Sequence, residues 1–201
     1  LQKEIADRGI TALSDLKPVR EGLYLWRGDI TTLQVDAIVN AANSGLTGCY
    51  SPLHGCIDNA IHTFAGVKLR LECAKIMEKQ GFPEPMGTAK ITKAYNLPCK
   101  HVLHTVGPMI SGALTQTDCQ ELASCYRSCL ELADKNRLDS ITFCCISTGE
   151  FRFPSKKAAE IAVKTVEDYK METGSSIQVI FNVFKDEDLF IYQNLLTYKS
   201  F

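Results

Sequence analysis

The sequence predicts an α/β domain in which helices cover a central sheet, and two features of the chain indicate this class. Apolar, strand-like runs alternate with helical patterns along most of the 201 residues, as they do in layered α/β folds. The runs at 37–39 and 141–146 are apolar on both faces, which is typical of central strands that helices cover on both sides. A chain of this length fits one domain with a sizeable core.

The expected elements follow one another in a simple order. Strands are expected at the segments LYLW, DAIVNAA, AKITKAY, HVLHTVG, SITFCCIS and IQVIFNVF. Helices are expected over about residues 57–79, 117–135 and 155–172, and a last helix follows the final strand. Residues 1–20 are expected to form a partly helical lead-in, and residues 21–201 the domain. The carboxyl ends of the two central strands are the expected ligand crevice.

Composition argues against two classes of partner. The formal net charge is -1, so no strong positive field favours nucleic acid. No segment has the roughly 18 consecutive apolar residues that a membrane span requires. The nine cysteines are an odd number, and no amino-terminal stretch resembles a signal peptide, so we expect a reducing, cytoplasmic setting. Four cysteines in apolar or helical patterns are expected in the core: Cys125, Cys129, Cys144 and Cys145.

The segment ISTGEFRFP has the composition of a phosphate-binding turn. Ser147, Thr148 and Gly149 follow a strand, and a helix is expected to begin near Pro154 and Ser155. Free backbone amides and the positive end of the helix dipole favour an anion there. An ordinary strand-to-helix turn with Ser155 as the cap explains the same residues equally well. Since neither the P-loop pattern GxxxxGKS/T nor GxGxxG occurs in the chain, a P-loop enzyme and a dinucleotide-binding Rossmann domain are disfavoured.

The stretch CYSPLHGC places three soft metal ligands in one short loop. Cys49, His54 and Cys56 lie within eight residues, and two thiolates with one imidazole suit a borderline-soft cation such as Zn2+. Structural zinc sites close with four protein ligands, whereas catalytic sites hold three, so three local ligands favour an open site. A closed, structural zinc completed by Cys99, Cys119 or another histidine is the main alternative. A metal-free redox pair is a third interpretation.

Six segments, in this order, resemble the macrodomain family, whose members bind ADP-ribose. The segments are RGDIT, VDAIVNAAN, IDNAIHTFAG, GTAKITKAYNLP, HVLHTVGP and ISTGEFRFP. Each motif alone is weak, but six in the right order with plausible spacing make a specific match. The resemblance implies a three-layer α/β/α macrodomain with a mixed central sheet, in which ADP-ribose lies across the carboxyl ends of the strands.

The resemblance also implies roles for individual residues. Asp29 would accept a hydrogen bond from the adenine amino group beside the backbone of Ile30, and Phe184 would stack on the ring unless it is a core aromatic. Asn43 would hold a ribose hydroxyl, while Asn40 would brace the loop. The diphosphate and the distal ribose would be wrapped by five successive residues: Ser147, Thr148, Gly149, Glu150 and Phe151.

Hydrolytic macrodomains usually carry a glycine-rich run between the NAAN motif and the next helix, and CYSPLHGC replaces that run here. In this respect the chain resembles the zinc-dependent branch of the family, which implies that Cys49, His54 and Cys56 bind one Zn2+. Asp58 matches the aspartate assigned to catalysis in metal-free members and would assist proton transfer, although an aspartate at a helix start also has an ordinary capping role. Asn43 would orient the ribose.

The function that the resemblance implies is a zinc-dependent hydrolase, which removes mono-ADP-ribose from a modified protein side chain at the anomeric carbon of the distal ribose. The implied partners are a lipoyl carrier protein of the glycine-cleavage type and a sirtuin-type ADP-ribosyl transferase. A non-catalytic module that binds ADP-ribose or O-acyl-ADP-ribose, with a structural zinc, is the alternative. Three histidines are expected to be structural: His62, His101 and His104. His62 lies one helical turn after Asp58, within hydrogen-bonding reach of its carboxylate.

Overall fold

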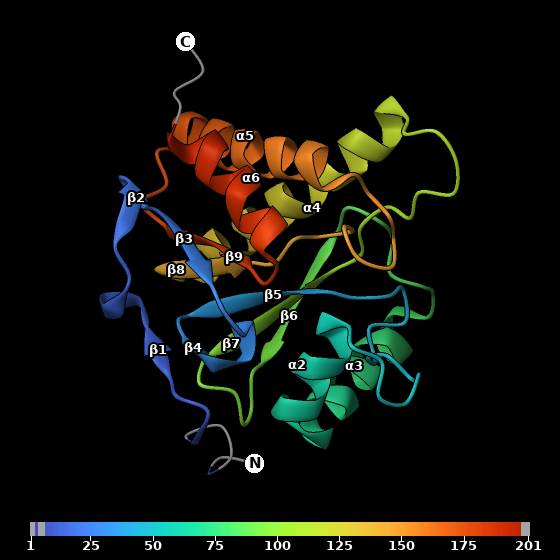
Figure 1. Ribbon diagram of the computed structural model, residues 1–201. Coiled ribbons are helices and arrows are strands. Elements are labelled where there is room, and N and C mark those ends of the chain that lie inside the picture. The colour runs from blue at the N-terminus through green and yellow to red at the C-terminus, as the bar shows by residue number, and fades with distance from the viewer. Residues whose placement is uncertain (1–2, 4–6, 198–201) are drawn as a thin grey trace.

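A mixed seven-stranded sheet forms the centre of the chain (Figure 1). The structure is a computed structural model and describes residue 3 and residues 7–197. From one edge of the sheet to the other, the strands are β2 (Pro18–Arg20), β3 (Leu23–Arg27), β9 (Gln178–Val183), β8 (Ser140–Phe143), β5 (Ala37–Ala41), β7 (His101–Thr105) and β6 (Ala89–Lys93). A separate two-stranded sheet consists of β1 (Thr11–Ala12) and β4 (Leu33–Gln34).

The five inner strands of the large sheet run parallel, and each edge strand is antiparallel to its neighbour. All six predicted strands are present, and β5 and β8 are adjacent near the middle of the sheet, as expected. Parallel strands end at the same edge of a sheet, so the loops that follow β3, β5, β7, β8 and β9 lie together. The predicted ligand crevice is at this edge.

Helices cover both faces of the sheet, as the sequence predicts (Figure 1). The helices are α2 (Ile57–Ala65), α3 (Val67–Gln80), α4 (Gln116–Lys135), α5 (Ser155–Thr173) and α6 (Asp186–Thr197), with two short 3-10 helices, η1 (Leu13–Asp15) and η2 (Ile30–Thr32). The helices α4, α5 and α6 lie together on one face, and α2 and α3 lie on the other. Within the described residues, no helix combines the length and the apolar character that a bilayer span needs.

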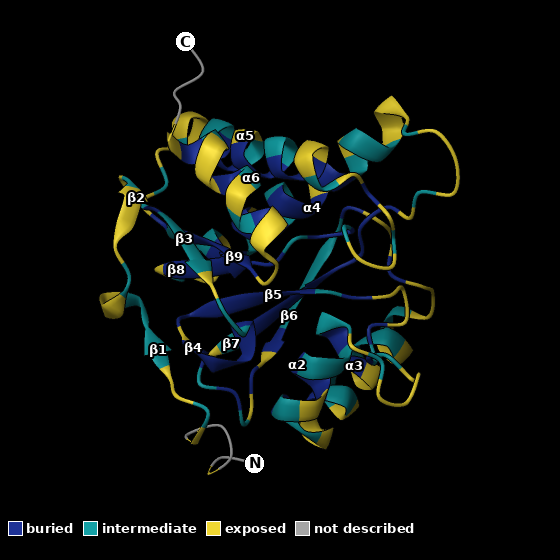
Figure 2. Cartoon of the chain, in the orientation of Figure 1, coloured by how far each residue is buried: buried dark blue, intermediate teal, exposed yellow. Residues whose placement is uncertain are grey.

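The inner strands and the sheet-facing sides of the helices form the core (Figure 2). Ile38 of β5 and Ile141 of β8 are fully buried, as expected of strands that are covered on both faces. Cys125 and Cys129 on α4 are also fully buried, and burial raises the pKa of both thiols. These two thiols therefore pack as small uncharged hydrophobes, as predicted.

Two segments differ from the prediction. The helix expected over residues 57–79 is divided into α2 and α3, because Gly66 between them has φ 87, a positive value that ends a helix and that glycine adopts readily. The later part of the lead-in contributes the strands β1 and β2 in addition to the single turn η1, and β2 is an edge strand of the large sheet. The helical prediction for residues 1–2 and 4–6 lies outside the described residues.

Asp36 joins three inner strands at the sheet edge opposite to the ligand crevice. Its carboxylate accepts hydrogen bonds from the amides of Asp139 at 2.8 Å and Ser140 at 3.0 Å, where β8 begins. The carboxylate also pairs with Lys100 at 2.6 Å, and the carbonyl of Asp36 accepts from the amide of His101 at 2.9 Å, where β7 begins. Burial by itself would raise the pKa of Asp36, but Lys100 and the amide donors together lower it. Asp36 therefore fixes β5, β7 and β8 relative to one another.

Replacing Asp36 by Asn is expected to lower the free energy of unfolding by about 1–3 kcal/mol at neutral pH, because charge-assisted bonds to buried amides are lost. The folded-state pKa is lowered, so this stabilisation is present above the ordinary carboxyl pKa and is lost as the pH falls through the folded-state value. The difference between wild type and D36N should therefore shrink on acidification, which urea unfolding at several pH values measures.

The matched control for this substitution is Asp168→Asn on α5. Asp168 is a partly exposed partner of Lys164, so the substitution should change the free energy of unfolding by less than about 1 kcal/mol. A difference between wild type and D36N that does not change with pH would contradict the role assigned to Asp36.

Candidate active site

The loops that follow β5 and β8 meet at the carboxyl edge of the sheet (Figure 1). The loop after β5 holds Asn43 and Cys49–Cys56, and the loop after β8 holds Ser147–Phe151. The two loops touch through His54 and Glu150, whose atoms Nε2 and Oε1 lie 3.2 Å apart. The two motifs that the sequence singles out therefore belong to one site, although their direct contact is not apparent from the sequence.

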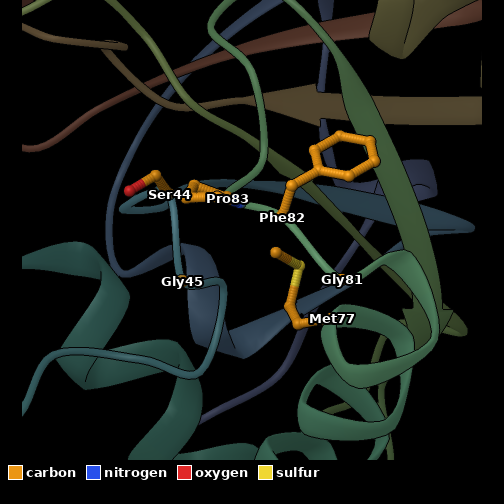
Figure 3. A pocket seen from close by; sticks show the side chains of 6 residues that line it. All are labelled: Ser44, Gly45, Met77, Gly81, Phe82 and Pro83. Carbon is orange, nitrogen blue, oxygen red and sulfur yellow. The ribbon is translucent and has the colours of Figure 1, made fainter.

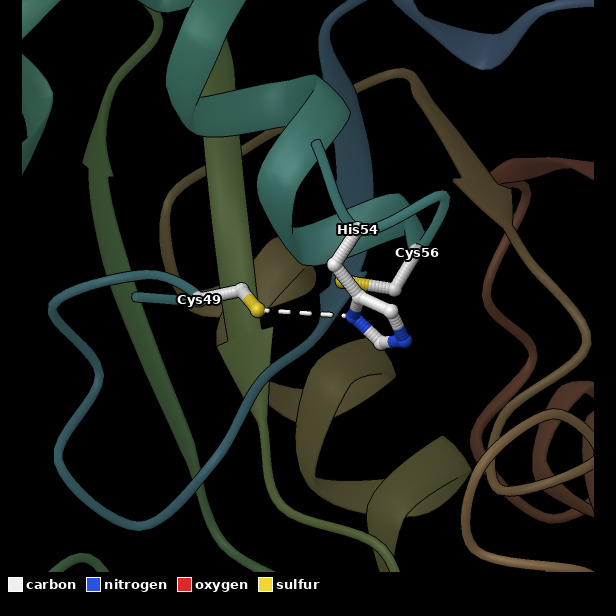
Figure 4. A group of neighbouring side chains, drawn as sticks. All are labelled: Cys49, His54 and Cys56. Carbon is white, nitrogen blue, oxygen red and sulfur yellow. Dashed lines mark hydrogen bonds between the residues drawn. The ribbon is translucent and has the colours of Figure 1, made fainter. Parts of the chain in front are cut away.

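Cys49, His54 and Cys56 form a compact group, which we call the clamp (Figure 4). Their ligand atoms all lie within 4.8 Å of one another, and Sγ of Cys49 is 3.4 Å from Nδ1 of His54. Around a tetrahedral zinc ion, bonds of about 2.3 Å to sulfur and about 2.0–2.1 Å to nitrogen place two such atoms roughly 3.6 Å apart. The three side chains therefore fit one cation of the size and softness of Zn2+.

A tight turn brings His54 back toward the first cysteine of the clamp. The amide of His54 donates to the carbonyl of Ser51 at 3.2 Å, and Pro52 takes the second position of the turn, where its fixed φ is favourable. Leu53 takes the third position with φ 58, a left-handed conformation that residues other than glycine rarely adopt. Asn59 holds the end of the loop by donating from Nδ2 to the carbonyl of His54 at 2.8 Å. The placement of the clamp thus depends on one strained backbone position.

The surroundings of the clamp shift the pKa values of its three side chains in different directions. The amide of Ser51, opposed by burial and assisted by His54, lowers the pKa of Cys49. Hydrogen bonding to Cys49, followed by that to Glu150, raises the pKa of His54. Burial raises the pKa of Cys56, and its proximity to Cys49 acts in the same direction. A bound cation would favour the ionised form of both thiols.

Among the described residues, no fourth histidine, cysteine or carboxylate joins the clamp. Cys99 is buried, with its pKa raised by burial to about 12, and Cys119 lies on α4. Neither belongs to the group, so the structure does not support the closed site that one of them would complete. The three clamp side chains are half-buried, which leaves a cation held there within reach of a ligand. Three donors are the number that the open-site interpretation expects.

Asp58 lies behind the clamp and does not cap its helix. The N-cap of α2 is Cys56, whose Sγ accepts from the amide of Asn59 at 3.4 Å, so the capping alternative for Asp58 is wrong. Oδ1 of Asp58 accepts from Nδ2 of Asn40 at 2.7 Å, and Oδ2 accepts from Nδ2 of Asn43 at 3.4 Å. Burial raises the pKa of Asp58, and the bond from Asn40 opposes this rise. Asn40 therefore braces the site through Asp58.

A buried polar group lies on the far side of Asn40. Nδ2 of Asn40 is 3.2 Å from Nδ1 of His104, whose Nε2 is 2.9 Å from Oγ1 of Thr92. Burial lowers the pKa of His104 to about 3 and that of His62 to about 4, so both rings are neutral at physiological pH. Nε2 of His62 is 3.6 Å from Asp58, and neither ring nitrogen of His62 has a hydrogen-bond partner among the described residues. Both histidines are buried, as predicted, but the hydrogen bond between Asp58 and His62 is not formed.

The loop after β8 offers free backbone amides. Among the described residues, the amides of Gly149–Phe151 have no acceptor. The loop is fixed on both sides, because the amide of Arg152 donates to the carbonyl of Gly149 at 3.0 Å and the amide of Phe153 donates to that of Ser147 at 2.9 Å. Successive free amides on a rigid loop form a binding site for an anion.

Two local features shape this loop. Ser147 has φ 65, and a Cβ atom on Gly107 would lie 2.1 Å from Oγ of Ser147, so only glycine fits at position 107. The N-cap of α5 is Pro154, which makes no side-chain hydrogen bond, and Ser155 is the first residue of the helix. The alternative in which Ser155 caps the helix is therefore wrong. The amino terminus of α5 stays free of a side-chain cap next to the open amides.

The residues predicted to contact adenine lie where β3 and β9 end. Phe184 follows β9 and is 74% exposed, so it is not a core aromatic. Ile30 is buried in η2, and Asp29 caps this helix by accepting from the amide of Thr31 at 2.9 Å. Arg8 also pairs with the carboxylate of Asp29, a contact that the sequence pattern does not reveal. The contacts with adenine stay predictions, and protein partners already hold Asp29 in place.

A pocket of about 340 Å³ lies beside the loop that follows β5 (Figure 3). Its lining residues are Ser44, Gly45, Met77, Gly81, Phe82 and Pro83. None of them is a predicted site residue, and none has a titratable side chain. The donors of the clamp and the carboxylate of Asp58 do not line this pocket.

Comparisons with known proteins find relatives along nearly the whole chain. The family model for the Macro domain matches residues 39–162. A protein from Treponema medium named Protein-ADP-ribose hydrolase is 63% identical over 201 residues, which cover 98% of this chain and 77% of that protein. A protein of the same name from Staphylococcus aureus (strain MSSA476) is 55% identical over 186 residues, which cover 92% of this chain and 70% of that protein.

A solved structure shares the fold. The Trypanosoma brucei macrodomain in complex with ADP-ribose is 37% identical and has a TM-score of 0.81, and the match covers 93% of this chain and 77% of that chain. The three-layer architecture with a mixed central sheet, predicted from the sequence, is thereby confirmed.

Replacing Asn40 is expected to lower the free energy of unfolding by an amount that depends on which side chain then lies beside Asp58. Asn40→Ala removes the donor at 2.7 Å and should lower the free energy of unfolding by about 1–3 kcal/mol. Asn40→Asp places a second carboxylate against a buried one and should cost about 3 kcal/mol or more at neutral pH. Urea unfolding of the wild type and both variants, with a chelator present, measures whether Asn40→Asp is the least stable of the three.

The control for this pair is Asn136→Ala at the end of α4. Nδ2 of Asn136 donates to the carbonyl of Leu132 at 2.7 Å in an exposed position, so its removal should cost less than about 1 kcal/mol. If Asn40→Asp is as stable as the wild type, the contact with Asp58 is not made in solution.

Proposed function

The chain belongs to the Macro domain family, and from this premise we propose that it is a zinc-dependent hydrolase that cleaves mono-ADP-ribose from a modified protein side chain. It is a hydrolase of protein-linked ADP-ribose, since two relatives of that name are 55% and 63% identical to it. The dependence on zinc, the roles of single residues and the narrower substrate are the parts that we propose.

The clamp carries the metal part of the proposal. Its three soft donors lie within 4.8 Å of one another, at the edge where the five parallel strands end. Asp58 lies behind the clamp, and its Oδ2 is 3.4 Å from Nδ2 of Asn43. A sugar held by Asn43 would therefore lie against both the carboxylate and the clamp. This proximity supports the proposal that a sugar-binding group, an acid–base group and a metal act together here.

Each part of the site has its own task in this mechanism. The amides of Gly149–Phe151 hold the diphosphate, and Asn43 orients a hydroxyl of the distal ribose. Cys49, His54 and Cys56 would hold Zn2+, which would supply Lewis-acid chemistry at the distal ribose. Asp58, held by Asn40, accepts and returns the proton that moves as the bond at the anomeric carbon breaks. Phe151 confines the sugar and excludes bulk water.

The narrower substrate in this proposal is a lipoyl carrier protein of the glycine-cleavage type, modified by a sirtuin-type ADP-ribosyl transferase. Family resemblance supports this pairing. The outer side of the clamp loop suits a protein-sized substrate, because Leu53 is fully exposed at its tip and Tyr50 is 71% exposed. An aromatic and an aliphatic side chain beside a reaction centre are typical contacts for a protein surface.

Metal analysis of the purified chain is expected to find one zinc per chain, which Cys56→Ser should lose. Cys56→Ser, His54→Ala and the chelated wild type should all lose hydrolysis of a mono-ADP-ribosylated protein, and added zinc should restore the wild type alone. The physical reason is that two remaining donors cannot hold the ion in a defined geometry.

The matched control for the metal is Cys119→Ser, since this thiol lies outside the clamp; the variant should keep both the zinc and the activity. Undiminished release of ADP-ribose by protein shown to be free of zinc would disprove the metal part. Zinc-loaded protein that binds ADP-ribose but releases none would favour a binding module with a structural zinc.

The carrier part has a separate test. The value of kcat/KM for a mono-ADP-ribosylated lipoyl carrier should exceed that for an auto-modified transferase by roughly tenfold or more, because contacts with the carrier surface add to those with the shared ADP-ribose. Release of ADP-ribose from the two substrates under identical conditions measures this ratio. Equal values would rule out the carrier preference and leave the hydrolase activity intact.

A further inference from the structure

Glu150 and His54 connect the two loops of the site across its centre. Oε1 of Glu150 lies 3.2 Å from Nε2 of His54. Both are loop residues, and the two loops come from different strands, β8 and β5. The roles implied by the family resemblance give Glu150 only a place in the wrapping loop, so its contact with a clamp residue has no assigned purpose.

The two nitrogens of the His54 ring face different partners. Nδ1 is the nitrogen 3.4 Å from Sγ of Cys49, and Figure 4 shows the other ring nitrogen pointing away from that sulfur. A cation between the clamp sulfurs would therefore take Nδ1. Nε2 would then carry the ring proton and donate it to Glu150. A carboxylate that accepts from a metal-binding histidine fixes the ring and makes it a better ligand.

The loop that carries Glu150 is held firmly enough for this role. The carbonyl of Gly149 accepts from the amide of Arg152 at 3.0 Å on one side of the loop, and the carbonyl of Phe151 accepts from the amide of Ile110 at 2.8 Å. Glu150 lies between these two anchors, so its position relative to His54 depends on the loop as a whole. The free amides of Gly149–Phe151 belong to the same short segment.

We propose that Glu150 is a positioning residue that orients His54 for the metal and thereby couples occupation of the diphosphate loop to occupation of the clamp. The inference rests on the zinc site of the proposed function and adds a link between its two halves. A phosphate group on the amides around Glu150 restricts the motion that remains between the two anchors, and Glu150 then holds the His54 ring in its metal-binding orientation. Coupling of this kind is reciprocal, so zinc must also strengthen phosphate binding.

The first test measures zinc affinity in the full chain by competition with a chromophoric chelator. Glu150→Ala should weaken zinc binding by about tenfold, at the lower end of the range for such outer partners, because the carboxylate is 71% exposed and screened by solvent. Glu150→Gln keeps an acceptor oxygen without the charge and should fall between wild type and Glu150→Ala. Glu78→Gln, at an exposed position on α3, removes the same charge and should leave the affinity unchanged.

The second test measures the coupling with ADP as the probe. ADP presents a diphosphate but has no distal ribose, so it lacks the group that the proposed function places against the clamp. In the wild type and in Glu78→Gln, zinc should increase the affinity for ADP in calorimetric titrations. In Glu150→Ala the affinity for ADP should be the same with and without zinc.

The outcomes separate this inference from the proposed function. If Glu150→Ala binds zinc as tightly as the wild type, or if zinc strengthens ADP binding equally in both proteins, the inference is wrong while the zinc-dependent hydrolase stands. If the wild type binds no zinc, both are wrong. A tenfold loss of zinc affinity together with the loss of coupling, in Glu150→Ala alone, supports the inference.

Discussion

The hydrogen bond from Asn40 to Asp58 is the constraint on which the geometry of the site depends. Asn40 is fully buried in β5, in the interior of the sheet, and its Nδ2 holds Oδ1 of Asp58 at 2.7 Å in the first turn of α2. Cys56 is the N-cap of the same helix. The hydrogen bond that fixes the first turn of α2 therefore also fixes the position of this clamp residue. A buried carboxylate without this donor would carry an uncompensated desolvation cost. The sheet therefore positions the reactive end of the loop through one amide.

The polar surroundings of Asp58 carry little charge of their own. His62 and His104 are neutral because burial lowers the pKa of each, and the asparagines contribute only dipoles. Arg70 lies over the ring of Tyr50 at 4.7 Å. Its positive charge lowers the pKa of Asp58, but burial has the larger effect and the pKa is raised overall. Arg70 and the hydrogen bonds from Asn40 and Asn43 therefore offset part of the cost of burying the carboxylate.

Features with a local or periodic signal could be predicted from the sequence. The apolar runs of β5 and β8 indicate central strands, and the spacing in CYSPLHGC brings the three clamp donors together in space. Contacts between distant segments carry no such signal, which is why the pairs Arg8–Asp29 and His54–Glu150 emerge only from the fold. The division of the long helix depends on the backbone angle of Gly66, and an isolated glycine in a helical pattern does not reveal this angle.

The clamp is assembled within one short stretch of chain, and this limits how much a bound cation would contribute to folding. All three donors lie within eight residues, so bridging them removes little freedom from the unfolded chain. The core consists of buried residues from the sheet and its covering helices. A chain built in this way would reach its native form without an ion and, under the proposed function, would take up zinc afterwards. The fraction of molecules able to turn over substrate would then follow the free zinc concentration of the surroundings, independently of how much folded protein is present.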